Sequence, residues 1–216
     1  MQNDFIIVLA WPEGLTTAAG SWYDKILARN GKYRVGHSAL VLVNSKTKKL
    51  KYFDFGRYHT PIGFGRARDS KTDPDLTLHT KPIISENRII NLKEILFEIK
   101  HIKSTHGKGK MYASLLLGIC YQKGYDYAKK VQEKGVVPYG PFVINGTNCS
   151  RYVASIMIAS KPGVFTRLRL KYPFCISPSP KRNISIANTN YYIVENKKQQ
   201  LIKKSFLKSY FSSIEQ

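Results

Sequence analysis

The chain has 216 residues, of which 43% are hydrophobic and 12% aromatic, so it can form a globular core and is not a disordered protein. Its 35 Lys and Arg against 14 Asp and Glu give a net charge of +21, so we expect a surface that attracts anionic partners. No motif of specific nucleic-acid recognition accompanies this charge. No run approaches the roughly 20 apolar residues that cross a bilayer, and we expect a soluble protein.

The cysteines and the N-terminus favour a cytoplasmic protein. Cys120, Cys149 and Cys175 are an odd number without metal-ligand pairing, which argues against a disulfide scaffold and for a reducing compartment. An apolar run at residues 5–11 follows Asp4 and has no basic segment before it. We interpret it as a first strand rather than a signal peptide.

In chain order, the pattern predicts a strand at 5–10 and a helical stretch at 22–29. A β-hairpin follows, with strands over 33–43 and 50–55. Residues 56–81 are irregular and rich in glycine and proline, and a further strand is expected at 76–84. Helices are then expected at 91–102, 110–122 and 125–134.

The hairpin places a histidine and a carboxylate on one face. A turn centred at 46–47 puts Ala39 opposite Asp54, and side chains two apart along a strand share a face, so His37 and Asp54 become diagonal neighbours. A carboxylate there can hold the imidazole tautomer whose other nitrogen meets a nucleophile. A register slip of one residue would move Asp54 to the other face.

The irregular segment resembles half of a glycine-rich phosphate loop at 63–68, but an arginine replaces the third glycine, so we predict no nucleotide site. Arg66 and Arg68 are kept as candidates to meet an anionic group of a substrate. His101 and His106 have no cysteine or carboxylate at ligand spacing. We therefore predict neither a metal nor a cofactor.

A candidate nucleophile follows a stiff loop. Residues 136–143 contain two prolines, a glycine and two aromatic residues, and form either a wall of a substrate cleft or a loop packed on the core. Asn148 is of a helix-capping type, and the apolar run at 153–158 predicts a short buried helix. Cys149 would begin that helix, where the macrodipole favours a thiolate. The alternative is a small buried residue without chemical function.

Beyond Gly163 the pattern predicts a strand near 166–170, a β-prone run at 184–194 and an amphipathic helix over 201–214. That helix either packs on the core or lies on an anionic membrane with its lysines toward the headgroups. We expect a single domain over 1–216, with 197–216 as a basic C-terminal extension.

These motifs resemble a known family. A strand that opens Gly36-His37-Ser38-Ala39-Leu40, followed by helices and then Asn148-Cys149 at the head of a helix, is similar to the circularly permuted NlpC-like branch of papain-fold cysteine hydrolases. That branch includes the lecithin retinol acyltransferase-like and YiiX-like proteins, in which the histidine precedes the cysteine. The resemblance implies an α+β papain-like fold with a central antiparallel sheet packed against helices.

Carried over to this sequence, the resemblance makes Cys149 the nucleophile, His37 the general base and Asp54 the orienting group. It implies a thiol-dependent amidase, peptidase or acyltransferase that acts on an amide, peptide or lipid ester through a thioester. The functional alternative is a non-catalytic papain-like module whose basic surface binds an anionic polymer or a membrane. No specific nucleic-acid partner and no oligomeric state are predicted.

The third catalytic position has alternatives. Acyltransferase-like members of the branch carry a histidine there, and residues 44–55 contain none. His59 is therefore an alternative to Asp54, and Tyr52 and Tyr58 have the same strand parity as Asp54.

Overall fold

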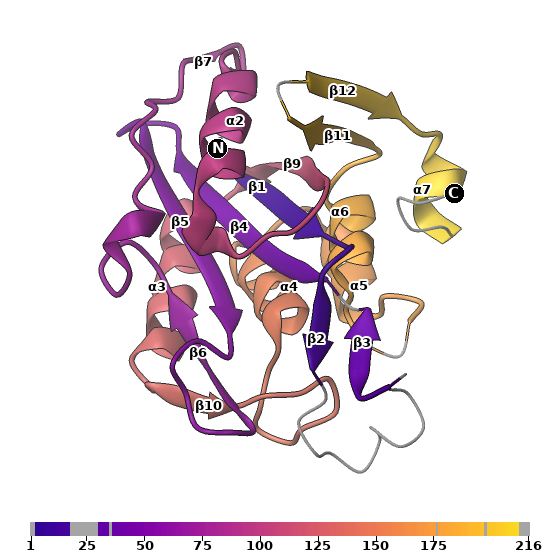
Figure 1. Ribbon diagram of the computed structural model, residues 1–216. Coiled ribbons are helices and arrows are strands. Elements are labelled where there is room, and N and C mark those ends of the chain that lie inside the picture. Colours follow the sequence, from indigo (N-terminus) through magenta and orange to yellow (C-terminus); the bar gives the residue numbers. More distant parts are fainter. Residues whose placement is uncertain (1–2, 18–29, 35, 176, 197, 212–216) are drawn as a thin grey trace.

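An eight-stranded antiparallel sheet packed against helices forms the centre of the protein (Figure 1). This is a computed structural model, and it describes residues 3–17, 30–34, 36–175, 177–196 and 198–211. The strand order is β10-β6-β5-β4-β1-β9-β11-β12. The predicted α+β class, with a central antiparallel sheet against helices, is confirmed. None of the helices in the described ranges is long and apolar enough to span a bilayer.

The strands of this sheet are β1 Asp4–Trp11, β4 His37–Asn44, β5 Lys49–Gly56, β6 Phe64–Arg68, β9 Met111–Ile119, β10 Val136–Pro138, β11 Asn190–Glu195 and β12 Lys198–Lys203. Two short hairpins stand apart from it: β2 Leu15–Thr17 with β3 Lys32–Arg34, and β7 Ile84–Ser85 with β8 Arg88–Ile89.

The helices are α2 Leu92–His101, α3 Tyr121–Gln132, α4 Cys149–Ala159, α5 Val164–Lys171, α6 Pro180–Ala187 and α7 Phe206–Phe211. Single 3-10 turns lie at η1 Pro74–Leu76 and η2 Lys103–Thr105.

Two hydrophobic cores cover the two faces of the sheet. Alternate side chains of the central strand β1 enter opposite cores, with Ile6 and Val8 on one side and Phe5 and Ile7 on the other. Helices α3, α4 and α6 contribute to the first core, and α2 contributes to the second. Because β1 is buried on both faces, its sequence is a continuous apolar run rather than an alternating one.

The predicted hairpin is present in the predicted register. Strands β4 and β5 pair antiparallel with Ala39 opposite Asp54. His37 is the first residue of β4, so its side chain lies at the end of the sheet. The expected helix at 22–29 lies outside the described residues.

Two expected elements were assigned the wrong structure. The prediction of a helix over 110–122 is wrong, because β9 is a strand that pairs with β1 and β11. Its residues alternate between the two cores, with Met111 in one and Tyr112 in the other, and two-sided burial produces the apolar run that suggested a helix. The prediction of a strand near 166–170 is also wrong, because α5 covers this segment.

Three further segments differ in part from their predicted secondary structure. The segment 76–84 starts at the last residue of η1 and continues as an irregular connection instead of a strand, and only Ile84–Ser85 is extended. The β-prone run at 184–194 is divided between α6 and β11. The expected C-terminal helix begins only at α7, because the preceding residues form the edge strand β12 on β11.

We expect Leu96→Ala to lower the free energy of unfolding by about 2–5 kcal/mol, because Leu96 is fully buried between α2 and the sheet. Urea denaturation followed by circular dichroism measures this change. Leu117→Ala is the control, since Leu117 is 46% exposed, and a change of under about 1 kcal/mol is expected. Equal effects of the two substitutions would contradict the assigned packing of α2.

Candidate active site

Three elements bring the predicted residues together at one end of the sheet. His37 begins β4, Asp54 lies near the end of β5 and Cys149 begins α4. His37 Nε2 lies 3.2 Å from Asp54 Oδ2, and a side-chain hydrogen bond joins His37 to Cys149. Because Nε2 is held by the carboxylate, Nδ1 is the ring nitrogen left for the thiol. Cys149, His37 and Asp54 therefore form one hydrogen-bonded line.

The Asp54 carboxylate is the most densely contacted group of the site. It is fully buried and accepts hydrogen bonds from Arg68 Nε at 2.9 Å and from Arg68 Nη2 at 2.6 Å. The Tyr52 hydroxyl donates to Oδ2 at 3.1 Å, and the Tyr58 hydroxyl at 3.4 Å. Burial alone would raise the pKa of Asp54, but the contacts with His37 and Arg68 outweigh burial and lower it.

Arg68 is a buried cation behind this carboxylate. It is 2% exposed, its guanidinium lies 3.4 Å from the centre of the Tyr58 ring, and Nη2 also donates to the Ser104 carbonyl at 3.0 Å. The expectation that Arg68 meets an anionic substrate group is therefore wrong. Arg66 is likewise engaged within the chain, in a two-pronged pair with Asp73 at 2.8 and 2.9 Å.

The sequence did not identify Arg68 as part of the site, because its segment lacked a clear strand pattern. Phe64–Arg68 is strand β6, and its pairing with β5 places Arg68 directly opposite Asp54. An arginine and an aspartate at directly opposed positions of neighbouring strands share one face of a sheet. Recognition of β6 was the signal needed to find this pair.

Aromatic rings hold the His37 imidazole in place. The buried Trp11 indole stacks on it with ring centres 5.8 Å apart, and Tyr58 meets it edge-on at 6.3 Å. The Tyr58 hydroxyl lies 3.4 Å from Nε2. The His37 side chain keeps 14% of its surface exposed, so the imidazole stays in contact with solvent at the site.

The start of α4 surrounds the Cys149 sulfur with polar groups. The Asn148 side chain caps the helix by accepting the Arg151 backbone N–H at 2.8 Å, as the sequence predicts. The Ser150 hydroxyl lies 3.8 Å from the sulfur, and the Ser38 backbone N–H donates to it. Cys149 is 7% exposed, and all three cysteines of the chain are free.

The two reacting side chains have opposite pKa shifts. Burial alone would lower the pKa of His37, but its hydrogen bonds with Asp54 and Cys149 raise that pKa to about 9. Burial alone would raise the pKa of Cys149, but the contact with His37 outweighs burial and lowers it. The thiolate is present above its lowered pKa, and the imidazolium is present below about pH 9. The contact between the two groups therefore favours the thiolate–imidazolium form of the pair.

The structure distinguishes between the alternatives for the third catalytic position. Tyr52 and Tyr58 both contact Asp54, so they belong to the same cluster. His59 is exposed and has a left-handed backbone, with φ of 52°. Asp54, and not His59, holds His37 Nε2.

The loop before Cys149 is fastened to α4. Arg151 Nη1 donates to the carbonyls of Gly140, Pro141 and Val143 at 3.1–3.3 Å. Tyr139 stacks on Phe55 at 6.0 Å, which matches the interpretation of a loop packed on the core. The same anchoring fixes the loop beside the thiol.

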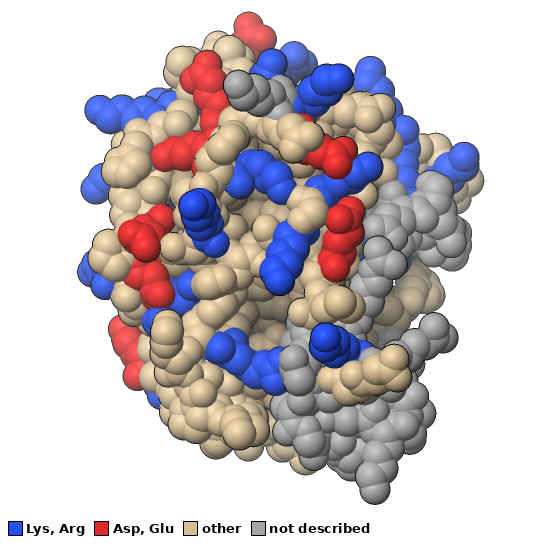
Figure 2. All heavy atoms as spheres, in the orientation of Figure 1, with Lys and Arg blue, Asp and Glu red and all other residues tan. Residues whose placement is uncertain are grey.

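Charge of both signs is spread over the face of the protein that Figure 2 shows. Figure 2 shows Lys and Arg scattered across the viewed face with Asp and Glu between them, around a central hollow. Among the residues that the structure describes, no group of three or more His, Cys, Asp or Glu could hold a metal ion.

Comparison with known proteins identifies the fold. Residues 6–163 match the family model described as type VI secretion system effector TseH-like. No curated protein matches the chain. The crystal structure of the type VI secretion system effector TseH is similar, with a TM-score of 0.61 over 92% of this chain and 97% of that chain, at 17% identity. At this identity the likeness shows the fold, which is the papain-like fold of NlpC/P60 proteins.

We expect iodoacetamide at about pH 6 to label Cys149 faster than Cys175, although Cys175 is exposed and Cys149 is buried. Although burial opposes it, the contact with His37 lowers the pKa of Cys149, whereas partial burial of its thiol raises the pKa of Cys175, so the thiolate fraction at this pH is higher for Cys149. Peptide mass spectrometry over a pH series measures both rates. His37→Ala should remove the preference, and a Cys149 that titrates like a free thiol near pH ~8.5 in both proteins would contradict the ion pair.

We expect Arg68→Met to move the pH profile of Cys149 labelling about one unit higher, so that labelling becomes up to about tenfold slower at pH values below the thiol pKa. With Arg68 the cluster of thiolate, imidazolium, carboxylate and guanidinium is neutral, and without it one negative charge is left buried. Protonation of the thiol relieves that charge. The measurement is the same labelling series, with circular dichroism to verify the fold.

Two variants serve as controls for Arg68→Met. The double variant Arg68→Met with Asp54→Asn removes one charge of each sign and should recover most of the labelling at about pH 6. Lys51→Met breaks the pair of Lys51 with Asp69, a carboxylate that Lys129 also contacts, and should leave the labelling profile unchanged. A profile for Arg68→Met that overlays the wild type would contradict a role of Arg68 in the charge of the site.

Proposed function

This chain belongs to the TseH-like family of type VI secretion system effectors, and on that basis we propose that it is a papain-like cysteine hydrolase or acyltransferase with Cys149, His37 and Asp54 as its catalytic residues. The observation that carries the proposal is the hydrogen-bonded line from Cys149 through His37 to Asp54. The opposite pKa shifts of thiol and imidazole are those that a cysteine nucleophile needs.

The proposed reaction proceeds through a thioester. The Cys149 thiolate attacks the carbonyl carbon of an amide, peptide or lipid ester, and the imidazolium of His37 gives its proton to the departing amine or alcohol. His37 then accepts a proton from water, or from another acceptor, as that nucleophile attacks the thioester. The acid or the transferred acyl product leaves and releases the Cys149 thiolate. Because His37 now carries the proton that it accepted, the thiolate–imidazolium pair is restored.

Asp54 keeps the ring of His37 in the orientation that this cycle requires. Its contact with Nε2 leaves Nδ1 toward the sulfur, and it stabilises the imidazolium that donates the proton. The Cys149 backbone N–H at the head of α4 is the proposed donor to the oxyanion. Removal of such a donor costs about 3 kcal/mol of transition-state stabilisation in enzymes where it has been tested.

We also propose that the chain belongs to the permuted branch of the NlpC-like enzymes. The support is the order along the chain, in which the histidine strand β4 precedes the cysteine helix α4. In the ordinary papain order the cysteine comes first.

The family description supports a proposal on delivery. We propose that the chain is made in the cytoplasm, where its three free thiols stay reduced, and that it acts as an effector after transfer by a type VI secretion system. The non-catalytic alternative predicts the same fold without a reactive thiol, so acylation of Cys149 separates the two.

We expect a chromogenic activated ester, p-nitrophenyl acetate, to acylate Cys149 with a burst of about one equivalent of p-nitrophenol. A burst arises because the thiolate attacks this ester faster than water hydrolyses the resulting acetyl thioester. Stopped-flow absorbance measures the burst, and mass spectrometry locates the acetyl group. His37→Ala should slow the burst by about 10²- to 10⁴-fold. Above about pH 9, where His37 loses its proton, the burst should persist, because p-nitrophenolate leaves without a proton and the thiol stays ionised above its lowered pKa.

The control for the burst is Cys175→Ala, which removes the exposed thiol and should leave the burst intact. Cys149→Ala should abolish it. A burst that survives Cys149→Ala, or that requires Cys175, would overturn the proposed nucleophile.

A further inference from the structure

The chain after residue 163, beyond the segment matched by the family model, exposes large apolar side chains. Phe165, Leu168 and Tyr172 are 62%, 50% and 65% exposed. They are three and four residues apart on α5 and its C-terminal cap, so they lie along one side of the helix. This exposed stripe faces solvent rather than either core.

Neighbouring elements extend the stripe into a patch. Phe206 of α7 packs on Phe165 with ring centres 6.1 Å apart, and it is itself 53% exposed. Leu207 and Phe174 are both 68% exposed. The apolar patch comprises Phe165, Leu168, Tyr172, Phe174, Phe206 and Leu207.

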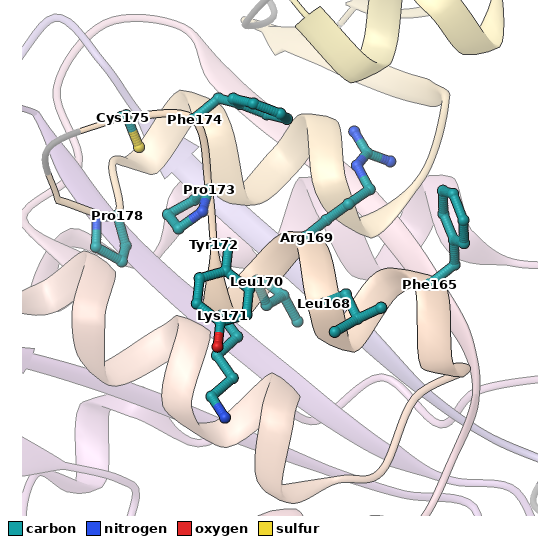
Figure 3. A pocket seen from close by; sticks show the side chains of 10 residues that line it. All are labelled: Phe165, Leu168, Arg169, Leu170, Lys171, Tyr172, Pro173, Phe174, Cys175 and Pro178. Atoms are coloured by element: carbon teal, nitrogen blue, oxygen red, sulfur yellow. The ribbon is translucent and has the colours of Figure 1, made fainter.

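A groove of about 720 Å³ accompanies the patch. Figure 3 shows Leu168, Leu170 and Tyr172 of the α5 segment beside Pro173 and Phe174 of the following loop, around this groove. Its lining is mainly apolar, with Lys171 extending from the same stretch of chain. The groove is separate from Cys149, which does not line it.

The surrounding chain is basic and almost free of acidic residues. No Asp or Glu occurs between Glu133 and Glu195. The same stretch contains Lys134, Arg151, Lys161, Arg167, Arg169, Lys171, Lys181 and Arg182, of which Arg169 and Arg182 are buried. Lys171 and Lys161 are exposed, and the Lys171 ammonium lies 5.8 Å from the centre of the Tyr172 ring. Within residues 134–194, exposed aromatic rings and lysines therefore occur together with no acidic residue in the same stretch of sequence.

We propose that the apolar patch and its lysines dock on the surface of an anionic lipid bilayer. Large apolar side chains gain free energy by entering the boundary between headgroups and acyl chains, and lysines gain it beside anionic headgroups. A nucleic acid would use the positive charge, but it would offer the Phe165 and Leu168 side chains no apolar medium. The docking surface is independent of Cys149 and adds membrane attachment to the proposed hydrolase.

The docking face differs from the one that the sequence suggested. The sequence suggested a helix at 201–214 that either packs on the core or lies on an anionic membrane, whereas β12 occupies the first part of that segment. The exposed stripe belongs to α5, and α7 contributes only Phe206 and Leu207 beside it.

The test is co-sedimentation of the full chain with vesicles of phosphatidylcholine alone and of phosphatidylcholine mixed with phosphatidylglycerol. We expect partition into the mixed vesicles to exceed partition into the neutral ones and to fall with salt. Phe165→Ser with Leu168→Ser should reduce it at least about fivefold, because the inserted apolar surface is lost. Both side chains are exposed, so the fold is retained, and circular dichroism verifies this.

The control variants replace comparably exposed apolar side chains, or a comparable lysine, at positions outside the patch. Ile83→Ser with Ile90→Ser deletes side chains that are 58% and 61% exposed beside the β7–β8 hairpin, and should leave partition unchanged. Lys171→Glu should reduce partition at least about fivefold, the effect of one lysine near an anionic surface. Lys93→Glu on α2 should have a much smaller effect.

Three outcomes would overturn the proposal: no preference for anionic vesicles, an equal loss in the Ile83→Ser/Ile90→Ser control, or no effect of Phe165→Ser with Leu168→Ser. A fourth is binding of a DNA duplex that is weakened by Lys171→Glu but not by Phe165→Ser with Leu168→Ser. That result would define a polyanion site instead of a membrane-docking site. Cys149→Ala should bind vesicles like the wild type, so failure of the hydrolase proposal is seen separately.

Discussion

A single buried carboxylate determines the arrangement of the site. Asp54 joins two cations that come from different strands, His37 of β4 and Arg68 of β6, and each contact requires its own strand register. A buried carboxylate is stable only with such partners, and a buried guanidinium has the same requirement. The folding of three neighbouring strands and the ionisation of the thiol are therefore coupled through one side chain.

The sequence predicted those parts of the fold that depend on local pattern. The hairpin register followed from the position of a polar turn, and the cap of α4 followed from Asn148, since both are decided within a few residues. Strand β9 and helix α5 were misassigned for a different reason. Met111–Ile119 contains good helix formers, yet its place between β1 and β11 is decided by pairing across the sheet. On α5, Val164–Lys171 alternates like a strand, but only Arg169 and Leu170 are buried.

The residues of the candidate site also differ in whether local sequence pattern or pairing across the sheet places them. Cys149, His37 and Asp54 were found because a helix start and a hairpin place them, and the structure brings them together. Arg68 was missed because its role exists only through its partner across the β5–β6 pair, in a segment that the sequence shows as glycine-rich and irregular. The stack of Trp11 on His37 has the same origin, since it depends on the pairing of β1 with β4. Contacts between segments far apart in sequence are what local pattern cannot supply.

The guanidinium of Arg151 links the loop before Cys149 to the first turn of the helix that carries the thiol. Because these hydrogen bonds hold the loop to the helix that carries the nucleophile, the entropy of ordering the loop is lost during folding and not when a substrate arrives. The outward side chains of the loop, such as Ile144 at 86% exposure, take no part in anchoring the loop to α4. Substrate preference can thus diverge between relatives through those outward positions while the position of the sulfur stays constant.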